Sequence, residues 1–433
     1  MLRKIHIDNF KPLKSIDFAC TGLNLLTGMN GAGKSSFIQM MKILFAAADG
    51  IESLYQEIRA EQFELGFDAD DVWYCYRREN PRICVQFNND SGMEFELRRI
   101  LDLCGASEKP GTFHLRHPAY FELMHNAYKK AWDLEHEDWD SENTGINVSP
   151  EDIRVAREEG DRKFAKLEKD VQKLEGSDVG IYNVYKKLWY GARFVDSFRH
   201  KPESIHEGGA YNGLLFVFEK IPNIKSFSPE GQNTIEFLYK SGADLIEKVN
   251  ACLNWVSPGA RLNIEKRQVG SRECFIEAFD YGVNGDSRLF KPQNVGFGVS
   301  YILPVLVTLL TAKKGSILVI ENPEAHLHPR GQAEIGKLIA ETVARGVQVF
   351  IETHSDHVIN GIRVAVKKGV LKPSDVNIAF FERKEHEVVD EEGKKAQEIY
   401  STVRDIKIDR NGSLSEYPED FMDEWNNQLM RLM

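Results

Sequence analysis

The sequence lacks several features that would each indicate a particular class of protein. Its six cysteines form no CxxC pair, so neither a zinc ribbon nor a disulfide framework is indicated. The longest mainly apolar run, Tyr301–Ala312, contains Pro304 and is far shorter than the roughly 20 residues of a membrane-spanning helix. The start, MLRKIHIDNF, has no apolar signal-peptide core. We therefore expect a cytoplasmic protein with reduced thiols and no membrane contact.

Positive charge is also in deficit. The chain carries 55 Lys and Arg against 66 Asp and Glu, a formal net charge of −11. A general affinity for nucleic acid is therefore not expected, and any DNA contact must be local or supplied by a partner. Hydrophobic residues at 42% and charged residues at 28% are ordinary for a globular protein. A length of 433 residues fits two or three domains, or one domain with a large insertion.

Hydrophobic periodicity predicts an α/β fold. One buried helix, Ser35–Ala48, interrupts N-terminal strands predicted at 2–10, 15–20, 23–27, 72–78, 83–88 and 93–100. A hairpin is predicted at 261–266 with 273–280, followed by a glycine-bearing turn and a helix from Ser300. Beyond it, strands 316–320, 347–352 and 376–382 alternate with helices 331–344 and 356–368. This alternation is typical of a parallel sheet with crossover helices.

The middle of the chain has a different character. An acidic run precedes a charged helical stretch, Pro150–Glu175, in which apolar residues recur at a 3-4-3 spacing. A short coiled coil or helical hairpin fits this spacing, and a single amphipathic helix fits equally well. We expect residues 104–189 to form a mainly helical insertion of unknown role.

The strongest motif is Gly28–Ser35, GMNGAGKS, which matches G-x-x-x-x-G-K-[ST] between a predicted strand and a predicted helix. In such a loop, backbone amides surround the phosphates of ATP, Lys34 neutralises the β- and γ-phosphates, and Ser35 offers its hydroxyl to Mg²⁺. We therefore expect ATP and Mg²⁺ as cofactors. The expected nucleotide-binding residues are Asn30, Gly31, Ala32, Gly33, Lys34, Ser35 and Ser36.

A second motif follows the predicted strand at 316–320. The carboxylate of Glu321 stands at the carboxyl end of this strand, where a magnesium-binding group belongs in a P-loop ATPase. We expect Ser35 and Glu321 to hold the metal. His326 and His328 are too few for a zinc site and are interpreted as a polar turn. Since Lys34 and Glu321 are 287 positions apart, a large segment is inserted between the two motifs.

This arrangement, with ENPEAHLHP at the strand end, resembles the ABC-type ATPase heads of the structural-maintenance, recombination-repair and overcoming-lysogenisation-defect lineages. It looks most like the small AAA-family ATPases of prokaryotic anti-phage defence operons. The resemblance implies an ABC-type P-loop ATPase head, in which a mixed N-terminal sheet and a parallel core sheet have flanking helices. The head would comprise residues 1–103 and 190–400. The segment Lys407–Asp423 resembles a short C-terminal domain of unknown function, and residues 401–433 would form a tail that packs on the head.

The resemblance also implies further site residues. Asn294–Tyr301, NVGFGVSY, stands where such heads carry a glycine-rich signature loop, which implies nucleotide contacts from Gly296, Gly298 and Ser300. It is not the common L-S-G-G-Q, because Gly296 occupies the position of the family serine. A plain turn capped by Ser300 therefore stays an alternative. His354, in ETHSD, resembles the switch histidine that contacts the γ-phosphate or the attacking water.

One position departs from the family pattern. Hydrolytic heads usually carry a glutamate after the magnesium carboxylate, and this chain has Asn322 there. An amide can orient water but cannot accept its proton. Glu324 is the alternative acid or base. The expected catalytic residues are Glu321, Asn322, Glu324 and His354, with slow hydrolysis.

By resemblance, the leading hypothesis is a homodimer or higher homo-oligomer that sandwiches ATP between Lys34 of one subunit and Gly296–Ser300 of the other. It would control a separately encoded effector, a nuclease, in antiviral defence. The sequence carries no TOPRIM-like or HNH-like nuclease signature, and only 79 residues follow His354. Two alternatives stay open: a DNA-repair head that clamps DNA in an ATP-dependent way, and a nucleotide-locked scaffold with little turnover. A transporter motor is disfavoured.

Overall fold

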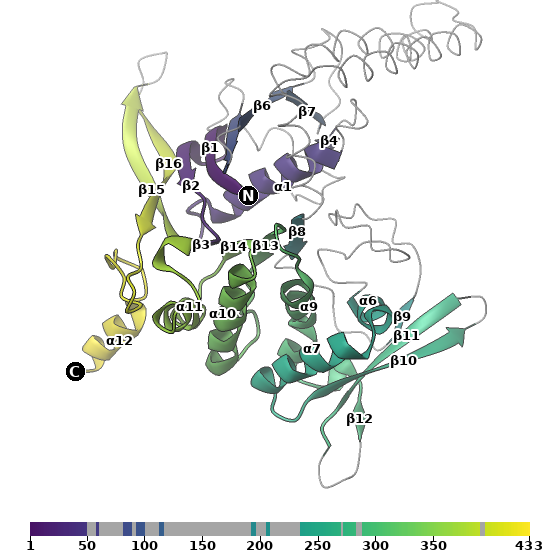
Figure 1. Cartoon of the computed structure of the whole chain (residues 1–433). Coiled ribbons are helices and arrows are strands. Elements are labelled where there is room, and N and C mark those ends of the chain that lie inside the picture. Colours follow the sequence, from purple (N-terminus) through teal and green to yellow (C-terminus); the bar gives the residue numbers. More distant parts are fainter. Residues whose placement is uncertain are drawn as a thin grey trace, which may run out of the picture.

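The structure is a computed structural model (Figure 1). It describes residues 1–49, 81–88, 92–99, 234–269, 272–282, 288–389 and 395–433, with short strands at 58–59, 112–116, 192–195 and 205–207. The predicted strand at 72–78, the helical stretch Pro150–Glu175 and most of the predicted insertion lie outside the described residues.

A six-stranded core sheet carries the motifs of the sequence. Its strand order is β16-β15-β3-β14-β13-β8, and all neighbours are parallel except β15 and β16. The bounds are β3 Leu23–Gly28, β8 Ala192–Val195, β13 Ile317–Glu321, β14 Gln348–Glu352, β15 Val376–Val389 and β16 Lys395–Ile406. β14 is buried at all five positions, as expected of a central parallel strand.

Helices cover both faces of this sheet. Figure 1 shows α9, α10 and α11 side by side on one face and α1 on the other. Their bounds are α1 Lys34–Asp49, α9 Leu303–Thr311, α10 Pro329–Ala344 and α11 Asp356–Lys367. The predicted α/β architecture is thus confirmed. The strands predicted at 316–320 and 347–352 and the helices at 331–344 and 356–368 are present, with ends shifted by at most two residues.

An antiparallel N-terminal sheet lies beyond α1. Its order is β2-β1-β5-β6-β7-β4, and Phe37 of α1 packs on Phe18 of β2 with ring centroids 4.7 Å apart. The bounds are β1 Leu2–Phe10, β2 Leu13–Ala19, β4 Ile58–Arg59, β5 Arg82–Phe87, β6 Gly92–Arg99 and β7 Thr112–Arg116. Because β7 pairs with β6, this sheet continues past residue 103, where we expected the insertion to begin.

A smaller unit precedes the core helices. The predicted hairpin is present as β10 and β11, which pair in register from Arg261↔Asp280 to Val269↔Arg272. β9 and β12 also pair with β11, β9 at Cys274–Ile276 and β12 at Phe279–Asp280. The bounds are α6 Thr234–Ser241, α7 Ala243–Val256, β9 Ile205–Glu207, β10 Arg261–Val269, β11 Arg272–Asp280 and β12 Leu289–Phe290. The helix expected from Ser300 begins earlier, as α8 at Phe297–Tyr301.

The C-terminal segment completes the core sheet. β15 is longer than the predicted strand at 376–382, and β16, which the sequence did not predict, pairs with it as a long hairpin. A side chain at Gly28 would overlap the backbone carbonyl of Phe381, so β15 packs directly against the start of the phosphate loop. The chain then folds back through a bridge at Ile408↔Leu414 and ends in α12, Glu424–Leu432. Among the described helices, none is long and apolar enough to cross a membrane.

Two glycines let α10 and α11 touch backbone to backbone. A Cβ at Gly336 would overlap the carbonyl oxygen of Val358, and one at Gly361 would overlap that of Ala333. In contrast, the nearest atom to a Cβ at Gly331, also in α10, lies 3.7 Å away. Because α11 begins two residues after His354, the predicted switch histidine, this contact helps to position that segment.

We predict that Gly336→Ala destabilises the protein by about 1–3 kcal/mol, the usual cost of overpacking. Alanine in place of glycine would otherwise favour a helix by about 1 kcal/mol. The matched control, Gly331→Ala, should leave stability unchanged or slightly increased. Denaturant unfolding of the two variants checks this, and equal midpoints would contradict the backbone contact.

Candidate functional site

The loop Gly28–Ser35 lies between β3 and α1, as the sequence predicts. Gly31 and Gly33 have φ angles of 77° and 101°, a region that glycine adopts without strain. Lys34 begins α1, and its Nζ donates to the carbonyl oxygens of Gly28 at 2.9 Å and Met29 at 2.8 Å. Burial lowers the pKa of Lys34, while the charge of Glu352 opposes this shift. The loop thus encloses a buried ammonium group.

The hydroxyl of Ser35 meets a carboxylate that the sequence analysis missed. Ser35 Oγ donates to the carboxylate of Glu352, with distances of 3.1 and 3.4 Å to its two oxygens. Glu352 ends β14, the strand between β3 and β13, and is paired in register with Glu321. Glu321 itself forms an ion pair with Lys42 of α1 at 3.0 Å. The carboxylate in contact with Ser35 is therefore Glu352, and Glu321 is its neighbour.

Glu352 is buried, with 4% of its surface exposed. Burial and the charge of Glu321 raise the pKa of Glu352, whereas Lys34 and the hydrogen bond from Ser35 lower it. A hydroxyl and two neighbouring carboxylates are oxygen ligands of the kind that Mg²⁺ takes, with water and phosphate oxygens filling its remaining positions. The residues present therefore fit the predicted magnesium ion.

The loops that follow β13 and β14 are joined. Glu324 Oε1 accepts a hydrogen bond from the backbone amide of His354 at 3.0 Å, and the amide of Asn322 donates to the carbonyl of Glu352 at 2.9 Å. Asn322 has a φ of 43°, a conformation that asparagine tolerates better than most residues. Two of the four predicted catalytic residues, Glu324 and His354, are thus bonded to each other, while Asn322 is bonded to Glu352 and directly follows Glu321.

The environment of His354 favours a neutral imidazole. Burial and the charge of Lys34 lower the pKa of His354, so the ring is uncharged at neutral pH and can accept a proton. Ser355, the next residue, caps α11 by accepting from the amides of His357 and Val358, and donates to Gln332 of α10 at 2.6 Å. These bonds fix the start of α11, directly after His354, against α10.

The signature-like segment lies against the loop that follows β13. A Cβ at Gly298 would overlap the carbonyl oxygen of His326, and the rings of Phe297 and Tyr301 lie 4.8 and 5.0 Å from that of His326. Ser300 does not cap a turn, because α8 already begins at Phe297. Its Oγ is buried and has no hydrogen-bond partner in the described part of the chain. Nucleotide contacts from Gly296, Gly298 and Ser300 stay a prediction.

The interpretation of His326 and His328 as a turn agrees with the structure. His328 caps α10 by accepting from the amide of Arg330, and His326 has a φ of 62°. No group of three or more His, Cys, Asp or Glu side chains in the described ranges is arranged to hold a metal ion by itself. A magnesium ion at Ser35 would therefore depend on the nucleotide for part of its coordination.

We predict that Glu352→Gln stabilises the nucleotide-free protein by roughly 1 kcal/mol, the size of a typical single-residue effect. The substitution removes a buried charge next to Glu321 but keeps an oxygen that can accept from Ser35. Thermal unfolding without nucleotide or metal measures this effect. Unchanged or lower stability would show that the carboxylate is favourable in its pocket.

Two family models match the chain, and the second begins before the expected boundary at residue 400. The family model for an AAA ATPase domain matches residues 1–359, and that for a protein of unknown function, DUF3696, matches residues 371–432. A search of curated proteins gave no match.

Solved structures of similar fold are heads of SMC proteins. A Pyrococcus furiosus Smc head with an extended coiled coil, bound to the C-terminal domain of ScpA, is 12% identical, with 100% of this chain and 99% of that chain covered and a TM-score of 0.43. An Smc head bound to the C-winged helix domain of ScpA is 10% identical, with 94% and 97% covered and a TM-score of 0.43. The Thermotoga maritima SMC head is 10% identical, with 94% and 99% covered and a TM-score of 0.38.

Proposed function

The chain belongs to the AAA ATPase domain family, and on this premise we propose that it binds ATP with Mg²⁺ at Gly28–Ser35 and hydrolyses it slowly. The observation that carries the proposal is the contact of Ser35 with Glu352 beside Glu321. It joins the phosphate-binding loop to two carboxylates at the carboxyl edge of the parallel sheet, where such sheets bind ligands.

In the proposed mechanism, Lys34 exchanges its bonds to two loop carbonyls for phosphate oxygens, and the loop amides from Asn30 to Ser36 surround the phosphates. Bound magnesium would neutralise charge on the β- and γ-phosphates. Ser35, Glu321 and Glu352 are the residues that would hold it. Lys34 is already desolvated, which strengthens its attraction for phosphate.

In this mechanism, residues of the two hydrogen-bonded loops that follow β13 and β14 would activate the attacking water. Glu324 is held in place by the amide of His354, and the neutral imidazole of His354 can accept or donate at its ring nitrogens. Asn322 can orient water without removing its proton, which supports slow turnover. The same asparagine favours, as second candidate, a scaffold that holds ATP with little hydrolysis.

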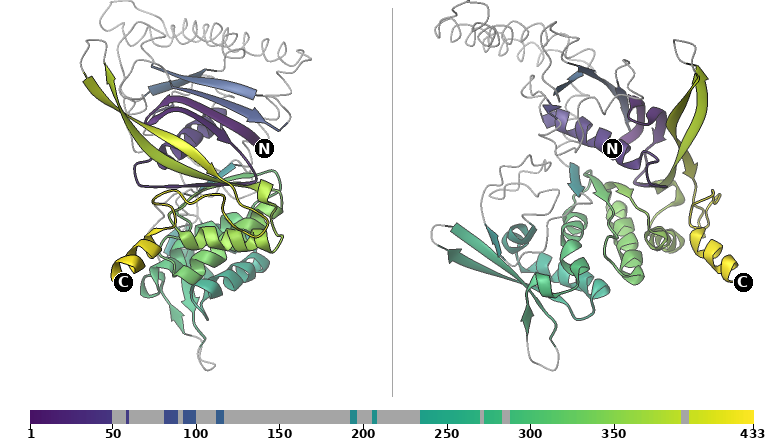
Figure 2. Two further views of the ribbon diagram at one scale, coloured as in Figure 1. Left: turned by 90° about the vertical axis from the view of Figure 1, so that its left-hand side faces the viewer. Right: turned by 180° about the vertical axis from the view of Figure 1, so that it is seen from behind.

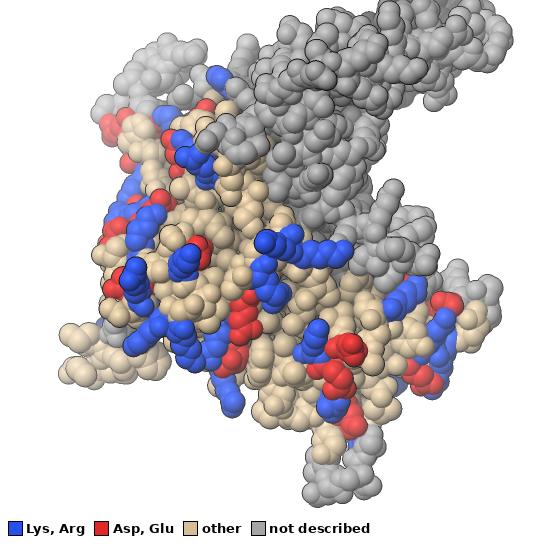
Figure 3. Space-filling model, viewed as in Figure 1, with Lys and Arg blue, Asp and Glu red and all other residues tan. Residues whose placement is uncertain are grey.

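We further propose that a second copy completes the site and that the homodimer controls a separately encoded effector, a nuclease, in antiviral defence in the cytoplasm. This part is supported by the sequence resemblance. A repair head that clamps DNA needs a continuous basic surface. On the face shown in Figure 3, acidic and basic side chains are interspersed, which gives this alternative less support. Salt-dependent binding of duplex DNA by the protein alone would favour that alternative.

We predict that Lys34→Ala weakens ATP binding by about 100-fold or more, because charge-assisted hydrogen bonds of roughly 1.5–3 kcal/mol each are lost. Lys337→Ala, which removes only a partly exposed ion pair with Glu334, is the matched control and should bind normally. Titration calorimetry with a non-hydrolysable ATP analogue gives both dissociation constants. Equal affinity of the two variants for the analogue would show that Lys34 does not bind the phosphates of ATP.

We predict that Glu324→Gln lowers the rate of phosphate release by about 10²-fold or more, the usual contribution of general acid–base catalysis. The amide oxygen can still accept from His354, so the loop should keep its shape. Asn322→Asp, which supplies a carboxylate and tolerates the positive φ, should raise the rate. The hydrolytic role of this loop is wrong if neither variant changes the rate while ATP binding is intact.

A further inference from the structure

The C-terminal helix α12 presents an apolar face to solvent. Trp425, Leu429 and Leu432 are spaced i, i+4 and i+7, so they share one side of the helix. Trp425 is 73% exposed, Leu429 40% and Leu432 83%. On the side seen in Figure 3, the surface at lower left, where α12 lies, shows no charged side chain. In a soluble protein, a contiguous exposed apolar face indicates an interaction site.

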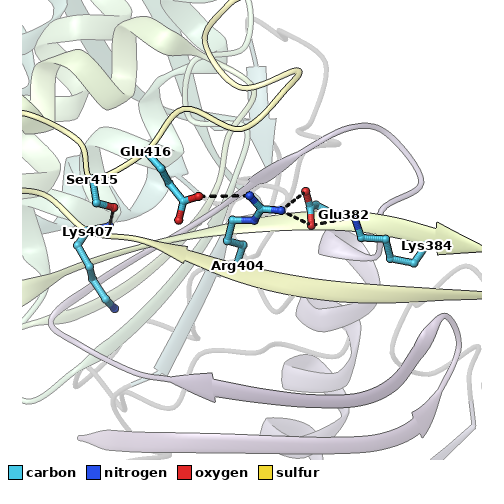
Figure 4. A network of polar contacts seen from close by, with 6 residues as sticks. All are labelled: Glu382, Lys384, Arg404, Lys407, Ser415 and Glu416. Carbon is cyan, nitrogen blue, oxygen red and sulfur yellow. Dashed lines mark hydrogen bonds and ion pairs between the residues drawn. The ribbon is translucent and has the colours of Figure 1, made fainter.

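The chain that leads into α12 is anchored to the core as far as Phe421, so the base of the helix is fixed. Phe421 is buried against Phe380 of β15, with ring centroids 5.5 Å apart. Arg404 of β16 bridges Glu382 at 3.1 Å and Glu416 of the tail at 3.2 Å (Figure 4).

A third anchor comes from α11, where Arg363 Nε donates to the carbonyl of Gly412 at 2.6 Å. Beyond these contacts, α12 projects past α11 at the edge of the molecule (Figure 2). Anchoring of this kind lowers the entropy lost when a helix binds a partner.

Acidic residues border this face at its N-terminal end. Four carboxylates fall between residues 419 and 424, and the helix itself carries a single basic residue, Arg431. The acidic residues are Glu419, Asp420, Asp423 and Glu424. An occupant that covers the apolar face therefore meets negative charge at one end and is matched by lysine or arginine.

One residue of this border acts on the start of α11. Burial raises the pKa of Asp356, His357 opposes this shift, and the charge of Asp423 adds to it. Asp356 is the first residue of α11 and lies two positions after His354.

We propose that α12 is a docking helix, bound in an apolar groove bordered by lysine or arginine on a second protein. This inference rests on the proposed function, because the second protein is its separately encoded effector. A groove encloses such a helix on several sides. Two α12 helices packed on each other would fall well short of the roughly 800 Å² per partner and 20–30 residues a side of a stable interface.

The test uses the full-length chain, affinity-tagged and co-expressed with the protein encoded by the adjacent gene as the candidate effector. Trp425→Glu places a charge on the apolar face, and Leu289→Glu, at a residue 55% exposed in β12, is the matched control. Both variants should bind the ATP analogue as the wild type does. We expect wild type and Leu289→Glu to retain the adjacent protein and Trp425→Glu to bind it at least tenfold more weakly.

The acidic border has its own test. Asp423→Asn combined with Glu424→Gln should weaken the complex and reduce its dependence on salt concentration. Unchanged affinity and salt dependence in this double variant would show that no lysine or arginine of the partner meets the acidic border. Unchanged affinity in Trp425→Glu would show that α12 is not a docking helix.

Two further outcomes separate the inference from the function on which it rests. If the isolated chain is a dimer that Trp425→Glu converts to a monomer by light scattering, the occupant is a second copy and the inference is wrong. If the wild type does not retain the protein encoded by the adjacent gene, both the docking helix and the proposal of a separately encoded effector are wrong. ATP binding through Lys34 is tested separately by the Lys34→Ala variant.

Discussion

The position of β14 between β3 and β13 is the constraint on which the site depends. β3 delivers the phosphate-binding loop, β14 ends at Glu352 and β13 ends at Glu321, so two parallel pairings bring a hydroxyl and two carboxylates to one edge. The strands are buried apolar segments and are held by the core rather than by the site. Because the sheet fixes these groups, the carboxylates remain adjacent despite their mutual repulsion, which Lys34 and Lys42 offset.

The C-terminal segment is part of this arrangement and not a separate module. β15 pairs with β3 on the side opposite β14, and the residues matched by the DUF3696 model include both strands of the hairpin. A side chain at Gly33 would overlap Ser401 of β16, and one at Gly28 would overlap the backbone of Phe381. The loop Gly28–Ser35 therefore packs on the same hairpin that contacts Glu416 and Phe421 of the tail.

The sequence predicts what depends on local pattern. The phosphate-binding loop, its flanking strand and helix, and Glu321 at the end of an apolar strand all follow from short-range signals. Glu352 also ends an apolar strand, VFIE, so the sequence shows a carboxylate at the end of this strand as well. Which carboxylate contacts Ser35 depends on the order of the strands, because β14 and not β13 lies beside β3. Hydrophobic periodicity does not reveal the order of strands in a sheet.

Other differences have similar causes. The sequence analysis did not predict β16, Lys395–Ile406, whose polar, charged and apolar residues follow no clear period of two; the segment forms a strand by pairing with β15. Ser300 was considered a cap because the helix was expected to begin there, whereas α8 begins at Phe297. The exposure of α12 could not be predicted, since an amphipathic pattern implies that the apolar face is covered but not by which molecule.

The most direct test of the central claim is a crystal structure of the protein with Mg²⁺ and a non-hydrolysable ATP analogue. The account predicts the phosphates within the loop Gly28–Ser35, and magnesium at about 2.1 Å from Ser35 Oγ. Glu321 and Glu352 should contact the metal directly or through one water. Nucleotide bound elsewhere, or magnesium with no contact to Ser35 and either carboxylate, would contradict it.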